Sequence, residues 1–150
     1  TRHHDEMKVL HRIADLALNP PASALPSLKD HLASKNPWHR YWACLAASAI
    51  GPSARPLVPA LINRLDDSHP MVRLRAAECL GALGEGDPRS ALLDVLNTVA
   101  TEAEALLTLN TIVYLRDHRS LKIDPAHLRP RFPGGQVARR LEYLRAAGTR

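Results

Sequence analysis

The chain has 150 residues, of which 45% are apolar and only 4% aromatic, and its formal net charge is +5. This length suits one domain with its own core, and a core built from Leu, Ala, Val and Ile is a helical composition. Cys44 and Cys79 lie within apolar helical patterns and argue against a disulfide framework, and no run of 18 apolar residues predicts a membrane span. The charge permits an anionic partner, but Lys and Arg are spread along the chain without a dense run.

The first elements predicted along the chain are two helices. Residues 5–18 carry apolar side chains at helical spacing, and residues 25–32 follow as a shorter helix. The residues before the first helix include neither an initiating Met nor an apolar signal region. We therefore expect a fragment of a longer protein, whose missing N-terminal part decides between the bacterial cytoplasm and periplasm.

The next segments repeat with a fixed period. Residues 36–43 recur as residues 69–76, with both the Pro and the Arg of the motif displaced by 33 positions, and residues 25–32 recur as residues 58–65 without a gap. In the second and third units a longer helix, helix A, ends at a glycine, and it is followed by a shorter helix B. In the second unit helix B is expected over residues 56–65, with prolines in its first turn. Such a period is typical of stacked-repeat proteins, in which each unit buries its apolar face against its neighbours.

The third and fourth units are less regular. The third closes with residues 90–96, and the fourth begins at Glu102. The apolar positions expected for helix A of the fourth unit are Leu106, Leu109, Ile112, Val113 and Leu115. Prolines and glycines forbid a continuous helix over residues 117–136, after which a final helix is predicted over residues 137–147. An irregular last unit is typical of a cap, because a terminal repeat must face water on one side.

Residues 70–84, which read Pro-Met-Val-Arg-Leu-Arg-Ala-Ala-Glu-Cys-Leu-Gly-Ala-Leu-Gly, resemble the helix A consensus of HEAT repeats, in particular the short type of phycobilisome-lyase-like proteins. The resemblance extends over residues 20–98 and implies an all-α fold, a right-handed α-α superhelix or HEAT-like solenoid. We expect a single HEAT-like domain over residues 1–150 with about four helical-pair units and a divergent C-terminal cap. The expected units are approximately 4–36, 37–69, 70–100 and 101–150, the last with an irregular loop at 117–136.

The resemblance also implies a structural role for the repeat arginines, Arg40 and Arg73. In this family the Arg reaches an Asp in the turn before it, and Asp66 or Asp67 is available to Arg73. The turn before Arg40 has no carboxylate at the equivalent positions. We therefore expect the interface at Arg40 to be weaker or to be held by another contact.

Helix A of the second unit carries an unusual apolar stripe of Trp38, Trp42, Leu45 and Ala49. The next unit has different side chains at these positions: Met71, Arg75, Glu78 and Ala82. If exposed, two tryptophans one turn apart would anchor a partner. Alternatively, residues before Thr1 or the irregular tail cover the stripe, or the tryptophans fill space within the core.

Two further surfaces are candidates for contacts. His31 and Arg64 occupy equivalent positions of helix B, which tends to line the concave surface in HEAT proteins, and with Lys29 they could bind an acidic segment or a phosphate; a solvated helix face is the alternative. The basic, proline-containing tail at 116–132 is a second candidate surface, although its single Phe offers little for base stacking.

Catalytic and metal-binding motifs are not found. The sequence has no Gly-x-Ser-x-Gly element and no phosphate-binding Gly-Lys-Ser/Thr loop, and its eight histidines form no His-x3-His pair. We therefore expect no catalytic residue, no cofactor and no metal.

The function expected is non-catalytic protein–protein interaction or scaffolding within a larger protein. Trp38, Trp42 and Leu45 would form the apolar anchor, and Lys29, His31 and Arg64 the polar contacts. The chain also resembles HEAT appendages of bacterial hydrolases such as sulfatases, which implies an accessory domain that contacts the rest of its own chain or another subunit, with no membrane contact. The alternatives are a basic nucleic-acid-binding solenoid, similar to HEAT-like DNA glycosylases, and a phycobilisome-lyase-type protein that handles a chromophore.

Overall fold

The computed structural model describes residues 2–18, 21–132 and 134–146, and all regular structure within these ranges is helical. The α-helices are α1 (Arg2–Leu16), α2 (Pro21–Leu32), α3 (Pro37–Ile50), α4 (Val58–Asn63), α5 (Pro70–Leu83), α6 (Arg89–Thr98), α7 (Glu102–Arg119) and α8 (Gly135–Ala146). Short 3-10 helices are η1 (Gly51–Leu57), η2 (Arg64–Asp66) and η3 (Pro125–His127). The predicted all-α class is confirmed.

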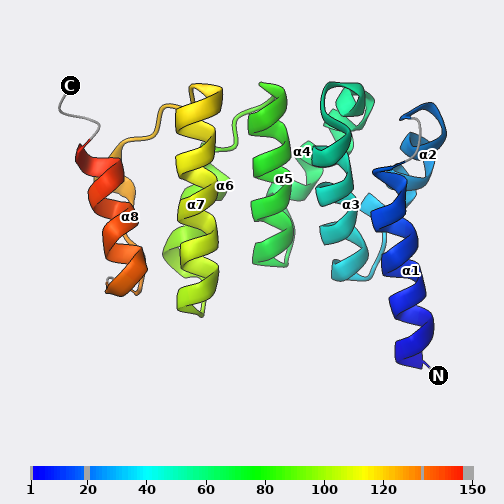
Figure 1. Ribbon diagram of the computed structural model, residues 1–150, viewed down its shortest axis with the longest axis horizontal. Helices are drawn as coiled ribbons and strands as arrows, with labels where there is room; N and C mark the ends of the chain where they lie inside the picture. The colour runs from blue at the N-terminus through cyan, green and yellow to red at the C-terminus, as the bar shows by residue number, and fades with distance from the viewer. Residues whose placement is uncertain (1, 19–20, 133, 147–150) are drawn as a thin grey trace.

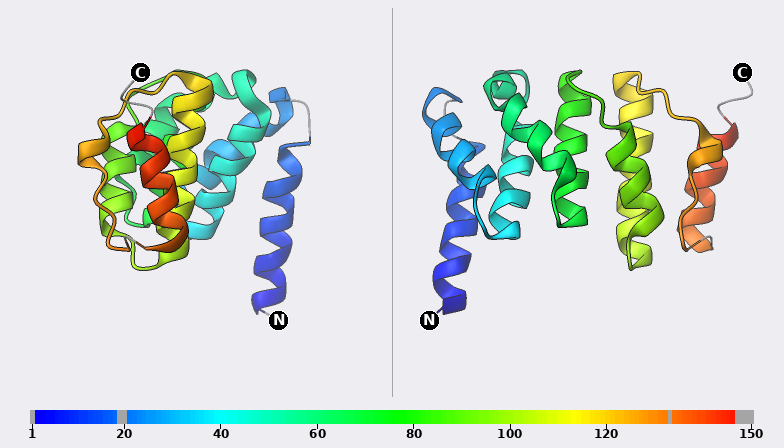
Figure 2. Two further views of the ribbon diagram at one scale, coloured as in Figure 1. Left: turned by 60° about the vertical axis from the view of Figure 1, so that its left-hand side comes forward. Right: turned by 180° about the vertical axis from the view of Figure 1, so that it is seen from behind.

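The helices are arranged in two rows. Helices α1, α3, α5 and α7 lie side by side in the front row, with α8 at its end (Figure 1). Seen from behind, α2, α4 and α6 form the second row, and the segment between α7 and α8 follows them (Figure 2). Helix α3 packs against α1, α2 and α5, α5 packs against α6 and α7, and α7 packs against α8. Each helix therefore contacts mainly helices one or two positions away along the chain, which is how stacked repeats are stabilised.

Helices α3 and α5 begin and end with the same type of residue. Asn36 caps α3 by accepting the Trp38 N–H at 2.9 Å, and a proline occupies the first turn of both helices. Gly51 and Gly84 follow the last helical residues with φ of 74° and 69°. A positive φ suits glycine, which has no Cβ, so both helices end at the glycines expected from the repeat.

Helix B of the second unit is shorter than expected. The segment predicted as one helix over residues 56–65 is divided into the end of η1, α4 and η2. Pro56 and Pro59 have no amide hydrogen and lie in adjacent turns, so regular i to i−4 hydrogen bonding cannot begin before Val58. The run from Pro37 to Asp66 is long and apolar enough to meet a composition test for a membrane span, yet it folds as separate elements of both rows.

The irregular segment of the last unit is shorter than expected. Helix α7 continues to Arg119, and Ser120 ends it with φ of 58°. Helix α8 already begins at Gly135, so the described irregular residues are 120–132 and 134, interrupted by η3, instead of 117–136. Ala147, the expected last residue of the final helix, lies outside the described residues.

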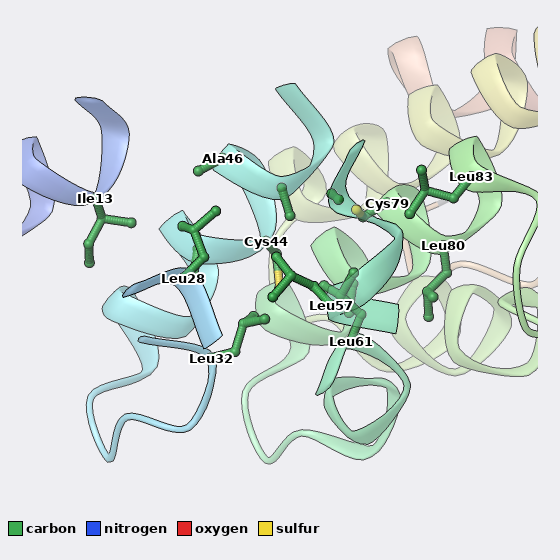
Figure 3. Close-up of a cluster of buried hydrophobic side chains, with 14 of the residues drawn as sticks. Ile13, Leu28, Leu32, Cys44, Ala46, Leu57, Leu61, Cys79, Leu80 and Leu83 are labelled. Carbon is green, nitrogen blue, oxygen red and sulfur yellow. The ribbon is translucent and has the colours of Figure 1, made fainter. Parts of the chain in front are cut away.

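The apolar core consists of two clusters that share α5. The first extends from Ile13 to Leu83 and fills the space between α1 and α5 (Figure 3). The second extends from Met71 to Leu144 and lies between α5 and α8. Helix α5 contributes different side chains to the two clusters, which explains why it is apolar on most sides. The unit count and the right-handed superhelical path remain predictions.

Candidate functional site

Asp67 accepts a group of charged hydrogen bonds between α3 and α5. Arg40 donates from Nε to Asp67 Oδ2 at 2.7 Å and from Nη2 to Oδ1 at 2.8 Å, Arg64 donates to Oδ2 at 3.0 Å, and the His69 N–H donates to Oδ1 at 3.0 Å. Burial raises the pKa of Asp67, but the bonds from Arg40 and from the His69 N–H outweigh it and hold the pKa below its ordinary value. We call Arg40, Arg64, Asp67 and His69 the Asp67 cluster.

The Asp67 cluster bears on two expectations about the repeat arginines. Arg73 was expected to pair with Asp66 or Asp67, and this is wrong, because its side chain pairs with Asp94. The interface at Arg40 was expected to be weaker or to be held by another contact, and the structure shows another contact. The carboxylate that binds Arg40 comes from the turn before α5, 27 residues later in the chain, and not from the turn before α3. The interface at Arg40 is therefore well paired, since the side chains of Arg40 and Asp67 are only 8% and 1% exposed.

Arg73 has one contact in common with Arg40. Each donates from Nη1 to the main-chain oxygen six residues before it: Arg40 to Ser34 at 2.8 Å and Arg73 to Asp67 at 2.7 Å. Arg73 then pairs through Nη2 with Asp94 of α6 at 3.0 Å, because the turn before α7 carries no carboxylate. Its Nε is buried and has no acceptor within the described residues. Of the two repeat arginines, Arg73 is therefore the one with incomplete partners.

Trp38 is the most exposed part of the stripe on α3. It lies at the start of the helix with 48% of its surface exposed. Its ring centroid is 6.0 Å from that of Tyr41 and 5.8 Å from that of His69. These two rings hold the indole against the first turns of α3 and α5, so the side chain is positioned on the surface rather than buried in the core.

Trp42 and Leu45, the other two large side chains of the stripe, are more enclosed, whereas Ala49 is exposed. Trp42 is partly buried and packs against the first core cluster, with its ring 6.0 Å from Tyr41, and Leu45 is also partly buried. The two readings of the stripe thus apply to different residues: Trp38 is open to solvent, and Trp42 belongs mainly to the core. Whether the stripe binds a partner remains a prediction.

A polar network continues from Tyr41 along the front row. The Tyr41 hydroxyl accepts from both Nε and Nη2 of Arg75 at 3.2 Å. Arg75 Nη1 donates to Glu78 Oε2 at 2.6 Å, which also accepts from Thr111 of α7 at 3.4 Å. Side chains of α3, α5 and α7 are thereby connected beside Trp38. The sequence marked Arg75 and Glu78 as the polar counterparts of the stripe but did not indicate that they pair.

The three polar candidates of the back row do not share one cleft. Lys29 is exposed, and Arg64 belongs to the Asp67 cluster. His31 lies 5.7 Å from the His39 ring and lines a cleft with residues of α1; burial, then the nearby His39, lowers its pKa. A cleft of about 510 Å³ does lie beside α4, but Asp66, Arg73, Asp87 and Asp94 line it with apolar neighbours.

The C-terminal part of the chain has a different charge from the rest. Residues 116–150 contain nine of the 20 Lys and Arg residues but only three of the 15 Asp and Glu residues. The sequence therefore places a net charge of +6 in this part, and the remaining 115 residues carry −1. The prediction that Lys and Arg are spread along the chain misses this imbalance, which a count of charges by segment reveals.

The irregular segment between α7 and α8 is fixed against α6. Asn97 donates from Nδ2 to the His127 oxygen at 3.2 Å, and its Oδ1 accepts the Arg129 N–H at 2.9 Å. Leu128, between these two residues, is buried in the second core cluster. Arg116 stacks on Tyr143 of α8 with 4.6 Å between the guanidinium carbon and the ring centroid. The segment between α7 and α8 thus has defined contacts although most of it is not helical.

No group of three His, Cys, Asp or Glu side chains within the described ranges is arranged to hold a metal ion. Burial raises the pKa of the Cys44 thiol and of the Cys79 thiol, and both are enclosed in the first core cluster. These thiols are therefore mainly protonated at neutral pH.

Among protein families, the one described as HEAT repeat matches residues 57–86. The matched stretch contains α4, η2 and α5, and with them three residues of the Asp67 cluster. No curated protein and no solved structure matches the chain. The matched stretch begins in the back row and ends in the front row.

Proposed function

We propose that this chain is a non-catalytic protein-interaction module, which binds a partner at the surface formed by Trp38, Tyr41, His69 and Arg75. HEAT repeats generally mediate protein interaction and scaffolding, which supports the class of function. The observation that carries the choice of surface is the exposed fraction of Trp38, 48%, for a large aromatic side chain. We call these four residues the Trp38 surface.

The Trp38 surface suits recognition because its side chains are held in place before a partner arrives. Tyr41 and His69 flank the indole, and Arg75 bonds to the Tyr41 hydroxyl, so little side-chain entropy remains to be lost on binding. Tryptophan, tyrosine and arginine are also the residues most often dominant in interfaces. A partner that covers the indole would bury apolar surface, and the polar groups of Tyr41, His69 and Arg75 around it would already be in place.

A finer proposal is that the module is an accessory domain of a larger hydrolase, such as a sulfatase, and contacts its catalytic domain. This proposal follows from the resemblance of short HEAT arrays to such appendages. In that case catalysis lies outside these 150 residues, and the Trp38 surface faces the parent protein.

Photo-crosslinking tests the interaction. A photoreactive phenylalanine analogue replaces Trp38 in the full-length protein, and in a matched control it replaces Tyr114, an aromatic residue of α7 that is 38% exposed. We expect a discrete crosslinked species from position 38 that is absent from position 114. Equal crosslinking from the two positions, or none from position 38, would contradict the proposal.

The two tryptophans should differ in their contribution to stability. Trp42→Ala removes a side chain packed on the core, and we expect a loss of about 2–4 kcal/mol in the free energy of unfolding, somewhat below the value for a fully buried aromatic. Trp38→Ala should cost less than about 1 kcal/mol because half of the side chain is exposed. Urea titration of both variants measures the difference, and a loss at Trp38 as large as at Trp42 would make Trp38 a core residue.

A further inference from the structure

From the groove at the C-terminal end of the stack we infer a second binding site, whose ligand is an acidic protein segment with apolar side chains. This inference rests on the proposed role in protein interaction and names the chemistry of a partner. The groove consists of two clefts of about 360 and 390 Å³ that share Leu121 and Lys122. We call it the Lys122 groove.

The cations of the Lys122 groove are available to a ligand. Arg119 and Lys122 are exposed, and within the described residues neither makes an ion pair. The other Lys and Arg residues from position 119 to 146 are also exposed and also unpaired within that range: Arg129, Arg131, Arg139, Arg140 and Arg145. The positive charge of this end is therefore not neutralised by the protein itself, and it attracts an anionic partner.

The carboxylates at the groove are already engaged. Asp87 accepts from Arg89 at 2.8 and 2.7 Å, and these bonds, together with one from the Arg89 N–H, lower the pKa of Asp87 to about 2. Glu85 is paired with Arg55, and Asp124 accepts the Ala126 N–H at 2.9 Å. Glu85 and Asp87 are thus neutralised by arginines of their own, and none of the three carboxylates pairs with Arg119 or Lys122.

Both clefts have apolar side chains in their walls. Leu80 and Leu121 line the first cleft, between the α5–α6 turn and the end of α7. Ile123, Pro125 and Leu144 line the second, between the irregular segment and α8. An acidic segment can place its own apolar side chains in the clefts while its carboxylates face the cations. An acidic ligand without apolar side chains cannot make both contacts.

The same features favour a protein over a nucleic acid. Binding of single strands usually combines a basic groove with several aromatic side chains on which bases stack. Among the described residues from 119 onward the aromatic side chains other than histidine are Phe132, which is partly buried, and Tyr143. Tyr143 is already occupied, because it donates to Asp117 at 2.8 Å and carries Arg116 on its ring. Stacking platforms are therefore too few for a nucleic-acid site.

Fluorescence anisotropy with defined probes tests the inference on the full chain. The probes are a labelled peptide of Glu and Leu, a peptide of the same charge in which Ser replaces each Leu, and a labelled oligothymidylate. At ~150 mM salt, which screens long-range attraction, we expect the Glu–Leu peptide to bind at least ~10-fold more tightly than either of the other probes. Equal affinity for the Ser peptide would mean that binding depends on charge alone, which would overturn the inference. Tighter binding of oligothymidylate would make this end a nucleic-acid surface instead.

Charge reversal then locates the site. The double variant Arg119→Glu with Lys122→Glu should weaken binding of the Glu–Leu peptide by at least ~10-fold. The control, Lys8→Glu with Lys35→Glu, makes the same change in net charge at exposed lysines that form no ion pair with described residues and lie far along the chain. It should change the affinity for the peptide by less than ~2-fold. Equal weakening by both pairs would overturn the assignment to this groove. If the peptide experiments fail but position 38 gives a discrete crosslinked species, only the Lys122 groove is rejected. If the crosslinking fails as well, the proposed role in protein interaction is rejected too.

Discussion

The arginines of the central repeats and the basic residues of the C-terminal end have opposite surroundings. All seven Lys and Arg residues between positions 36 and 118 are in ion pairs, whereas none of the seven between 119 and 146 is paired within the described residues. Pairs such as Arg40 with Asp67 connect one element to another along the stack. The charges of the central repeats are thus paired within the fold, and those of the C-terminal end are free of ion pairs with described residues and available to the partner proposed above.

The largest expected effect comes from removing a central carboxylate. Asp67→Asn keeps the size of the side chain but leaves the buried guanidinium of Arg40 without a counterion, and we expect a loss of about 3–5 kcal/mol in the free energy of unfolding. Asp94→Asn is the matched control, since Asp94 pairs with Arg73 but is 56% exposed, and it should cost about 0–1 kcal/mol. Urea titrations give both values, and similar losses for the two variants would contradict the special role of Asp67.

Acid should weaken the central repeats through the same residue. The pKa of Asp67 is lower in the folded protein than its ordinary value of 3.8, so the unfolded chain takes up the proton first as the pH falls. This contribution to stability is complete above pH 3.8 and declines as the pH drops toward the folded pKa. Urea titrations from pH 6 downward should show a smaller decline for Asp67→Asn than for the unchanged protein, and parallel declines would argue against the linkage.

At the C-terminal end, neutral hydrogen bonds should matter more than charges. Asn97→Ala removes both bonds that fix the segment around Leu128 to α6, at an expected cost of about 1 kcal/mol. Asn110→Ala, at an exposed position of α7, is the control and should have little effect. Hydrogen exchange of the Arg129 amide should accelerate only in the Asn97 variant; unchanged exchange would mean that the buried leucine alone holds the segment.

The smallest effect is expected from reversing the unpaired charges. Arg139→Glu with Arg140→Glu should alter the free energy of unfolding by no more than about 0.5 kcal/mol, because both side chains are exposed and make no ion pair with described residues. Thermal or urea unfolding measures it. A loss above about 1 kcal/mol would show that these arginines stabilise the cap, and the contrast between the two regions would then be weaker.

The sequence predicted the helices of the central units best. Helices α3 and α5 end at the glycines that the repeat indicates. The apolar positions Leu109, Ile112 and Leu115 of the fourth unit are fully buried. The prediction was less accurate where prolines are closely spaced, as in the segment around α4, because several short hydrogen-bonding patterns then compete. For the candidate site, the stripe was recognised, but its division into an exposed Trp38 and a packed Trp42 was not.

The sequence by itself determined the period, the helical class and the positions of Arg40 and Arg73, because apolar spacing and glycine or proline placement act within a few residues of each position. Only the tertiary structure decided which carboxylate binds each arginine. The partner of Arg40 lies 27 residues away, in a turn that approaches it only after α3 and α5 have packed. The Lys122 groove is likewise a product of packing, since its walls come from α5, α7, α8 and the segment between the last two.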